Sequence, residues 1–399
     1  MEKKKLQTIS RRSFLQKSSI AALTVPVMNL KMTSTDQYLS PSQPSIVKPE
    51  WRNRKEGMVY RQLGRTGLMV SELAFGTERN NPDNPGPVEL AFEKGINYFD
   101  TAPSYNKGLA EATLAKVFNT PAKRDQVFIA SKVTAFFVTR NRLYREIFDT
   151  LPDSRKEEIM NKAARLRLES GIEKPEYFMV YWPGQQKQMD GAFISDAMKA
   201  EYGDRVERSP ELKKAIVQSV EESLKRIGTD YLDVLHCPHA AATSEEIRNP
   251  LITETFSELR KQGKVRFLGF SSHHGMAELI ETAIDLGCFD VVMPAYNVIN
   301  HAFLDNILKK AREKGIGLIA MKAAMAVATP YDPEQVPVPE WRVNKLNQII
   351  PEEMKLQVKA FLWALQNQDL SAVNAGMYTN EMVLENLTVV GRKIDLKLA

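Results

Sequence analysis

Three residues with complementary acid–base chemistry lie close together in the first half of the chain. Asp100 is near the end of one predicted strand, Tyr105 is on the loop after it, and Lys132 is at the end of the next strand. Side chains at the ends of adjacent parallel strands can meet, because such strands run about 4.8 Å apart. An ionised aspartate keeps a nearby lysine charged, and a charged lysine lowers the pKa of a nearby tyrosine. We therefore expect Tyr105 to act as a general acid.

Each of these residues also has an ordinary structural explanation when it is taken alone. Asp100 could cap a helix or stabilise a turn, Tyr105 could be a surface aromatic residue, and Lys132 could be a solvated charge. The three explanations are weaker together, because groups that perturb one another's pKa gather preferentially at functional sites. The set is therefore the strongest catalytic candidate in the chain.

The segments around these residues alternate short apolar runs with amphipathic helical patterns. The apolar runs lie at residues 70–77, 97–102, 127–133, 232–238, 265–272, 290–297, 316–323 and 371–377. The helical patterns that follow them lie at residues 87–95, 109–118, 209–228, 254–264, 275–287, 304–315, 355–366 and 379–391. Eight alternating units predict an α/β fold with a parallel sheet closed into a (β/α)8 TIM barrel. An open doubly wound sheet is the alternative, but no G-x-G-x-x-G fingerprint follows the first strand.

One insertion, residues 134–208, interrupts the alternation after the third strand. It contains helical patterns and an aromatic-rich stretch with Tyr177, Phe178, Tyr181 and Trp182. Barrel enzymes build their sites from loops at the carboxyl ends of the strands, and this insertion joins that face. We expect it to form a wall of the substrate pocket, because its aromatic side chains need burial or a ligand. A solvated decoration is the alternative.

The first 30 residues have the layout of an export signal, with a basic stretch before a short apolar run. The apolar run is too short to span a bilayer, which needs about 20 apolar residues. Arg11 and Arg12 stand just before Phe14 and Leu15, which is typical of a twin-arginine signal. We predict export by the twin-arginine machinery to the periplasm, with the segment either cleaved or kept as a periplasm-facing membrane anchor. An ordinary basic signal region is the alternative.

Residues 31–57 are polar and contain several prolines, which predicts a linker. The barrel domain is therefore expected to occupy residues 58–399. The formal net charge is only +5, and three of the lysines lie within the first five residues. No basic stripe interleaved with aromatic residues is present, so no nucleic-acid partner is expected.

The chain has two cysteines, Cys237 and Cys288, and no Cys-x-x-Cys spacing. Two cysteines without that spacing predict neither a zinc site nor an iron–sulfur cluster. We expect no metal site. A disulfide between the two is possible from the sequence, but two free thiols are favoured.

Several segments together resemble the aldo/keto reductase family. They lie at residues 60–77, 95–118, 127–133, 223–236, 264–272 and 363–386, and they include the block Asp-Thr-Ala-x-x-Tyr that starts at Asp100. The resemblance covers nearly all of residues 58–399 except the insertion. It implies that Tyr105 is the proton donor and that Lys132 and Asp100 tune it.

The resemblance also implies a histidine at the end of the fourth strand that orients the substrate carbonyl. An ungapped count places this position on Pro238, so His236 and His239 are both candidates. His236 has the barrel-facing parity of the expected position, because side chains alternate along a strand. His239 is nearer in ungapped register, so the choice between the two stays open.

The family resemblance implies a nicotinamide cofactor, NADP or NAD, held by the last strands and loops. The implied cofactor-binding residues are Gly76, Thr77, Ser271, Ser272, Lys322, Gly376, Met377, Thr379, Glu385 and Asn386. Several positions depart from the family pattern. Met293 replaces a glutamine, Met321 replaces a tyrosine that stacks on the nicotinamide, and residues 378–380 lack the basic group that binds the 2′-phosphate.

These observations predict an exported oxidoreductase that reduces a small-molecule carbonyl, possibly a sugar, or oxidises the corresponding alcohol. The altered cofactor positions favour one alternative, a ligand-binding protein on the same barrel with a degenerate cofactor site. A sugar hydrolase or lyase would require paired carboxylates at strand ends. Only Asp100 is convincing in that role.

Overall fold

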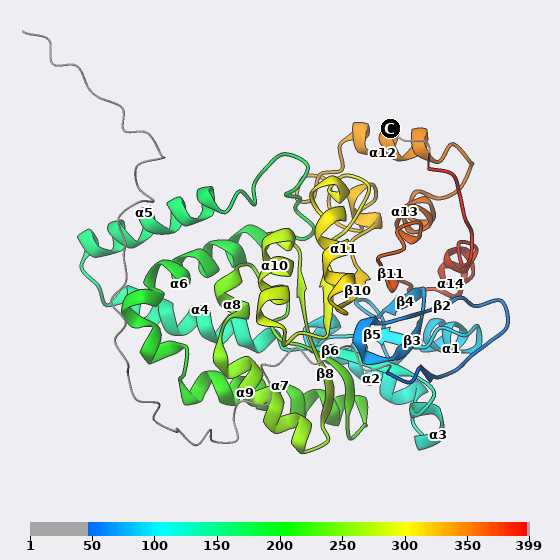
Figure 1. The fold of residues 1–399 in the computed structure, drawn as a ribbon, viewed down its shortest axis with the longest axis horizontal. Helices are drawn as coiled ribbons and strands as arrows, with labels where there is room; N and C mark the ends of the chain where they lie inside the picture. The colour runs from blue at the N-terminus through cyan, green and yellow to red at the C-terminus, as the bar shows by residue number, and fades with distance from the viewer. Residues whose placement is uncertain (1–46, 397–399) are drawn as a thin grey trace, which may run out of the picture. The chain divides into compact units, whose positions relative to one another are not determined.

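The computed structural model describes residues 47–396 (Figure 1). The predicted twin-arginine segment 1–30 and the greater part of the predicted linker therefore lie outside the described residues. No helix within the described range is long and apolar enough to cross a membrane.

Eight parallel strands close into a barrel, as the sequence predicts (Figure 1). They are β4 (Leu73–Gly76), β5 (Tyr98–Asp100), β6 (Phe128–Lys132), β7 (Leu232–His236), β8 (Val265–Ser272), β9 (Val291–Pro294), β10 (Gly317–Ala320) and β11 (Ala372–Gly376). Each strand pairs with the next along the chain, and β11 pairs with β4 to close the ring. The strands are almost wholly buried because helices cover the outside and side chains fill the inside.

The alternation of side chains along the strands places polar groups in the barrel mouth. Phe128 and Ala130 of β6 belong to the cluster of apolar side chains inside the barrel, and Tyr98 of β5 belongs to the same cluster. Residues two positions apart on a strand share a face. Lys132 and Asp100 therefore continue the inward-facing rows of their strands, at the carboxyl ends.

Helices surround the barrel and pack their apolar sides against it. They are α1 (Gly86–Glu93), α2 (Leu109–Val117), α3 (Pro121–Arg124), α7 (Pro210–Ile227), α8 (Ser244–Ile247), α9 (Pro250–Lys261), α10 (Met276–Leu286), α11 (Asp305–Glu313), α12 (Glu340–Ile349), α13 (Leu356–Leu365) and α14 (Asn380–Leu387). Helix α7 shows why the sequence specifies these ends. The Ser209 side chain accepts a hydrogen bond from the Leu212 N–H, Pro210 occupies the first turn, and Gly228 ends the helix in the left-handed conformation.

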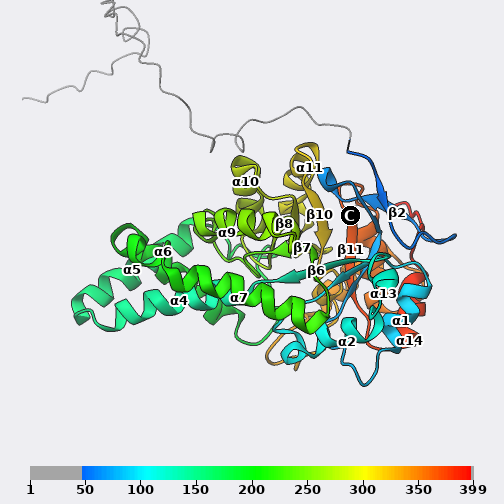
Figure 2. The same ribbon diagram turned by 90° about the horizontal axis from the view of Figure 1, so that it is seen from below.

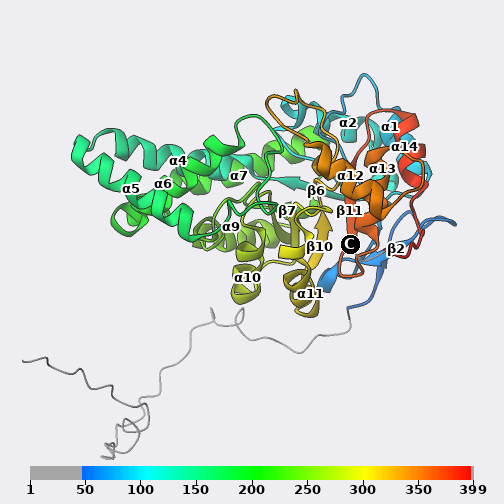
Figure 3. The ribbon, with the colours of Figure 1, turned by 90° about the horizontal axis from the view of Figure 1, so that it is seen from above.

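The insertion forms three helices, α4 (Thr134–Asp149), α5 (Asp153–Glu169) and α6 (Gln185–Val206), that extend to one side of the barrel (Figures 1, 2 and 3). These helices share an apolar core of their own, built around Tyr144, Met189 and Met198. The predicted helical insertion after the third barrel strand is therefore present.

A small sheet with the order β1–β3–β2 precedes the barrel strands. It consists of β1 (Glu50–Trp51), β2 (Tyr60–Gln62) and β3 (Leu68–Ser71). Leu63 and Leu68 pack among the apolar side chains inside the barrel. The backbone at Gly64 lies so close to Gly317, at the start of β10, that a β-carbon would be 2.2 Å from its nitrogen. The turn between β2 and β3 therefore covers the amino-terminal end of the barrel.

Strand β1 corrects the sequence-based start of the domain at Met58, because it lies inside the segment predicted to be a linker and pairs in parallel with β3.

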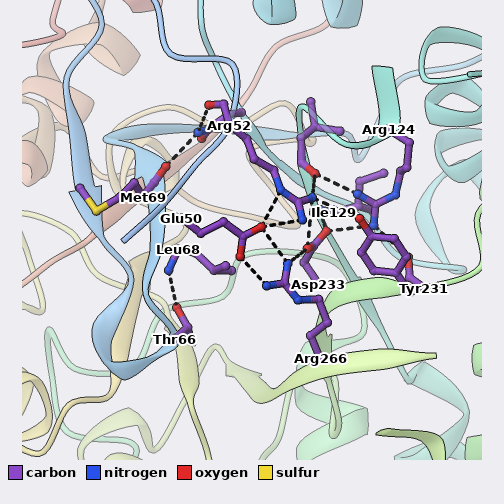
Figure 4. A network of polar contacts seen from close by, with 12 residues as sticks. Glu50, Arg52, Thr66, Leu68, Met69, Arg124, Ile129, Tyr231, Asp233 and Arg266 are labelled. Atoms are coloured by element: carbon purple, nitrogen blue, oxygen red, sulfur yellow. Dashed lines mark hydrogen bonds and ion pairs between the residues drawn. The ribbon is translucent and has the colours of Figure 1, made fainter. Parts of the chain in front are cut away.

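Glu50 of β1 and Arg52 just after it belong to an ion network at the barrel base (Figure 4). Asp233 is fully buried there, with Arg124 at 2.9 Å, Arg266 at 2.6 Å and Arg52 at 3.4 Å. Glu50 pairs with Arg266 and Arg52. The polar composition of residues 31–57 predicted a linker, because charged side chains and not apolar ones attach the end of this segment to the barrel.

Candidate active site

Asp100 and Lys132 form a buried ion pair at the carboxyl ends of β5 and β6. The Lys132 Nζ donates to Asp100 Oδ2 at 2.5 Å and to the Thr101 carbonyl oxygen at 2.8 Å. Both side chains are inaccessible to solvent. Burial raises the pKa of Asp100 and lowers the pKa of Lys132, whereas the attraction between the two charges opposes both shifts.

Tyr105 lies on the 3₁₀ turn Tyr105–Gly108 that follows β5. The next two residues, Asn106 and Lys107, have left-handed backbone conformations with φ of 45° and 53°. Such conformations are unfavourable for residues other than glycine and are concentrated at functional sites. The Lys132 Nζ lies 4.7 Å from the centre of the Tyr105 ring. The structure therefore brings together the three residues that the sequence singles out.

The direction of the Tyr105 pKa shift differs from the sequence-based expectation. Burial, reinforced by the negative charge of Asp100, raises the pKa of the Tyr105 phenol well above its ordinary value. Lys132 does not lower it because Asp100 balances the lysine charge at short range. The phenol is therefore protonated at neutral pH and is a proton donor in this state.

The two candidate histidines have different surroundings. His236, the last residue of β7, is fully buried next to Lys132 in the sheet register, and within residues 47–396 neither of its ring nitrogens has a hydrogen-bond partner. His239 lies beyond the strand end, is 9% exposed, and has its ring centre 6.1 Å from that of Tyr105. Its Nδ1 is 2.8 Å from the Thr134 hydroxyl. The geometry therefore places His239, and not His236, beside Tyr105.

Both histidines are held neutral by their surroundings. Burial is the largest cause, and the positive charge of Lys132 acts in the same direction. These effects lower the pKa of His236 to about 3 and lower the pKa of His239 well below its ordinary value. A neutral imidazole offers one N–H donor and one acceptor nitrogen.

A cavity of about 510 Å³, called here the His239 pocket, opens beside Tyr105. Loops after several barrel strands and the insertion line it together. The residues involved include Glu78, Arg79, Ser104, Tyr105, Asn106, Thr134, Phe137, Trp182, Gln188, His239, His273, Lys322 and Tyr331. Trp182 is the one aromatic residue of the predicted stretch 177–182 that reaches this pocket. Tyr177 and Tyr181 are instead buried against Glu278 and Asn297.

A second cavity of about 310 Å³, called here the Asn374 pocket, adjoins the first. The two share Glu78, Tyr105 and Lys322. The Asn374 pocket lies at the carboxyl ends of β4, β10 and β11. Its other lining residues include Gly76, Met321, Ala323, Met325, Gln357, Phe361, Asn374, Gly376, Tyr378 and Met382. Tyr105 therefore stands where the two cavities meet.

Three of the residues implied as cofactor ligands line the Asn374 pocket, namely Gly76, Lys322 and Gly376. Others make contacts within the protein. The Ser271 hydroxyl accepts from the Ala240 N–H, and the Ser272 hydroxyl lies within hydrogen-bond distance of the carbonyl oxygens of Ala241 and His274.

The remaining implied ligands lie near the last strand and helix. Met377 and Asn386 are buried, Thr379 caps α14, and Glu385 pairs with Lys355. The Thr77 hydroxyl donates to the Asp100 carbonyl oxygen. None of these residues lines either of the two adjoining pockets.

Sequence reasoning missed Asn374, which the structure places beside the acid–base set. Its Nδ2 donates to Asp100 Oδ2 at 3.3 Å, and its buried Oδ1 has no hydrogen-bond partner. Gly76 and Gly376 are register partners in the adjacent strands β4 and β11. A β-carbon on Gly76 would lie 3.1 Å from Asn374 Nδ2, and one on Gly376 would lie 2.6 Å from the Tyr378 hydroxyl, so the two glycines make room for these side chains. An amide side chain in this cavity wall has the chemistry to pair with the carboxamide of a nicotinamide. The signal in the sequence was a single polar residue inside an otherwise apolar strand.

His273 was also missed by sequence reasoning, although it lines the His239 pocket. It follows Ser272 directly at the end of β8. A histidine just after a predicted barrel strand was the available signal. No group of three or more side chains suited to holding a metal ion occurs in the described part of the chain, and both cysteines are free thiols.

Comparison with known proteins identifies the family. The model of the aldo/keto reductase family matches residues 73–200 and 193–366. The chain belongs to the aldo/keto reductase family. Its membership indicates a carbonyl oxidoreductase that works with a nicotinamide cofactor.

Individual relatives of this aldo/keto reductase are distant. It is 25% identical over 355 residues to an L-galactose dehydrogenase of Arabidopsis thaliana, covering 83% of this chain and 87% of that protein. It is 26% identical over 293 residues to the aldo-keto reductase AMT2 of Alternaria alternata, covering 68% of this chain and 67% of that protein. The solved structure of the aldo-keto reductase AKR11C1 from Bacillus halodurans, holo form, shares its fold. That match has a TM-score of 0.56 and 21% identity, over 84% of this chain and 92% of the other.

Proposed function

We propose that this aldo/keto reductase reduces the carbonyl group of a small, sugar-like molecule, or oxidises the corresponding alcohol, with Tyr105 as the proton donor. One observation carries the proposal. Tyr105 lies at the junction of two cavities, and the buried Asp100–Lys132 pair lies against it. One cavity would hold the substrate and the other the nicotinamide, so that both meet at the phenol.

The residues of the His239 pocket would position and protonate the substrate. Burial keeps the Tyr105 phenol protonated, so it can donate to a carbonyl oxygen that becomes negatively charged. His239 is neutral, and its Nδ1 contacts Thr134, so Nε2 is the nitrogen left for the substrate oxygen. Two donors directed at one oxygen stabilise the charge that develops there. Lys132, 4.7 Å from the centre of the Tyr105 ring, would attract the phenolate that forms as the phenol gives up its proton.

The Asn374 pocket would hold the nicotinamide of NAD or NADP, which supplies or accepts hydride when bound. The Asn374 amide would pair with the carboxamide, and Gly76 and Gly376 line the same cavity without side chains of their own. Lys322 lines this cavity 4.0 Å from Glu78, and its ammonium group would be the cation that meets an anionic part of the nucleotide. The side chains of Tyr378, Thr379 and Asn380 offer no cation for a 2′-phosphate.

Titration of the purified protein with NADH and with NADPH tests the cofactor assignment. Binding should appear as a change in nucleotide fluorescence, and Asn374→Leu should weaken it with either nucleotide. The absence of binding of both nucleotides at millimolar concentration would reject the oxidoreductase assignment for this chain.

That result would favour a second candidate, a ligand-binding protein with a degenerate cofactor site. The observation behind this candidate is that the Ser271 and Ser272 hydroxyls are committed to the protein's own backbone. Met321 occupies the wall where the family places a stacking tyrosine. The same titration therefore separates the two candidates.

We also propose that the protein is exported by the twin-arginine machinery to the periplasm, or to the membrane facing it. The support is the sequence Ser10-Arg11-Arg12-Ser13-Phe14-Leu15 ahead of a short apolar run. This route carries folded proteins, so a cofactor could be loaded before export. Replacement of both arginines by lysine should retain the protein in the cytoplasm, as measured by fractionation. Unchanged export of that variant would reject the proposal.

A further inference from the structure

His273 presents an unused hydrogen-bonding ring to the His239 pocket, apart from the acid–base set. It follows strand β8, lines the cavity, and is only 5% exposed. Its buried Nδ1 has no hydrogen-bond partner in the structure. The other ring nitrogen, Nε2, is not shielded in this way and makes no hydrogen bond to a described residue, so it is the one that a ligand in the cavity can reach.

The insertion holds this ring in place. The ring of Trp182 meets the ring of His273 edge to face, with centres 4.5 Å apart and planes at 72°. The Lys322 Nζ lies 5.9 Å from the centre of the Trp182 ring. Gln188, at the start of α6, donates to the Ala240 carbonyl oxygen at 2.9 Å. The insertion is therefore attached to the loop that carries His239, and its tryptophan supports His273.

The wall around His273 differs chemically from the reacting end of the pocket. Burial, and then the positive charge of Lys322, lowers the pKa of His273 well below its ordinary value, so the ring is neutral. A neutral imidazole donates one hydrogen bond and accepts another, as a hydroxyl group does. Phe137 and Trp182 provide apolar surface in the same cavity. A simple aldehyde has nothing that pairs with this wall, whereas a sugar offers both hydroxyl groups and apolar ring carbons.

We propose that His273 is a specificity-determining residue that hydrogen-bonds a substrate hydroxyl group remote from the reacting carbonyl, with Trp182 supporting it. The substrate class is therefore polyhydroxylated, an aldose or the corresponding sugar alcohol or lactol. This inference rests on the proposed oxidoreductase function and assigns a role to the insertion within it. The insertion supplies a second recognition wall opposite the general acid.

The test compares His273→Phe with the wild type on two kinds of probe. One is 4-nitrobenzaldehyde, which has no hydroxyl group. The other is a panel of both enantiomers of galactose, glucose, xylose and arabinose, assayed for reduction and for oxidation with both nucleotides. The variant should lose about ten- to a hundredfold in kcat/KM for the best aldose, as expected for a lost buried hydrogen bond. Its loss on 4-nitrobenzaldehyde should be much smaller, because that probe has no hydroxyl group to bind His273.

His273→Gln serves as the matched variant, because it keeps a donor and an acceptor and should recover part of the aldose activity. Unfolding midpoints of both variants establish that the fold is intact. Equal losses on both probes, or no loss on the aldose, would overturn the role of His273. Reduction of 4-nitrobenzaldehyde with no turnover of any aldose by the wild type would overturn the substrate class alone. Failure of the wild type on every probe would instead reject the proposed function.

Discussion

At the scale of single residues, the acid–base chemistry depends on Tyr105 as the group that meets both cavities. Tyr105→Phe removes the proton donor and leaves the ring in place. Because positioned general acids contribute about 10²- to 10⁴-fold, kcat/KM for carbonyl reduction should fall by that factor. Steady-state kinetics measures the loss, and unchanged nucleotide binding serves as the control. Full turnover by the variant would remove Tyr105 from the role of acid.

A pair of matched variants can decide whether His236 or His239 orients the substrate carbonyl. His239 faces the pocket beside Tyr105, whereas His236 is enclosed in the barrel. His239→Asn should lower kcat/KM by about 10²-fold, as loss of an oxyanion donor does. His236→Asn should change the unfolding midpoint more than the kinetics. The reverse pattern would assign the role to His236.

The site residues show what the sequence could and could not predict. Asp100, Tyr105 and Lys132 were predictable because strand ends and side-chain alternation are local properties. The alternation of side chains along β7 correctly predicted that His236 lies inside the barrel. The His239 pocket begins beyond the end of the strand, where this alternation no longer determines which side chain faces it. The hydroxyls of Ser271 and Ser272 bond to the loop that begins at Ala240, a contact between distant segments that no local pattern reveals.

At the scale of elements, the eight strands were predictable from their apolar runs, but the attachment of β1 was not. Charged side chains attach β1 to the barrel, and the carboxylate of Asp233 forms ion pairs with three arginines from separate segments. A polar segment with prolines resembles a linker whether or not its charges have buried partners. Helices α4 and α5 of the insertion were predictable from their patterns, whereas helix α6 was not predicted. The packing of Trp182 on His273 required the three-dimensional arrangement.

The barrel-base network predicts a large loss of stability in Asp233→Asn. The change leaves the guanidinium groups of Arg52, Arg124 and Arg266 without a buried carboxylate (Figure 4). Breaking a buried ion pair on one side typically costs about 3–5 kcal/mol. Urea unfolding should show that decrease in the free energy of unfolding, with an unchanged slope against urea.

Glu211→Gln is the matched control for the barrel-base variant, because the Arg142–Glu211 pair is exposed on both sides. Exposed pairs contribute about 0–1 kcal/mol, so this variant should unfold almost as the wild type does. Equal small effects in the two variants would show that the base network does not anchor β1.

At the scale of the whole molecule, buried neutral histidines gather at the carboxyl ends of β7 and β8. His236, His239, His273 and His274 are all buried there, and burial is the largest cause that lowers the pKa of each. The unfolded chain takes up protons on these rings at mildly acidic pH, and the native state excludes them. The burial of these histidines therefore has two consequences. It keeps the ring of His273 neutral in the proposed substrate-binding wall, and it makes the native state less stable at acidic pH.

His274 allows this linkage to be measured away from the reacting groups. Burial, and then the charge of Arg167, lowers its pKa to about 4 in the native state, against about 6.5 in the unfolded chain. Its contribution to stability is therefore complete above about pH 6.5 and is lost as the pH falls towards about 4. The loss approaches about 1.4 kcal/mol per pH unit inside that window.

The variant His274→Asn lacks the titrating group. The free energy of unfolding of this variant should therefore fall less steeply than that of the wild type between about pH 6.5 and 5. Urea unfolding across this range gives the two slopes, and parallel slopes would show that His274 titrates alike in both states.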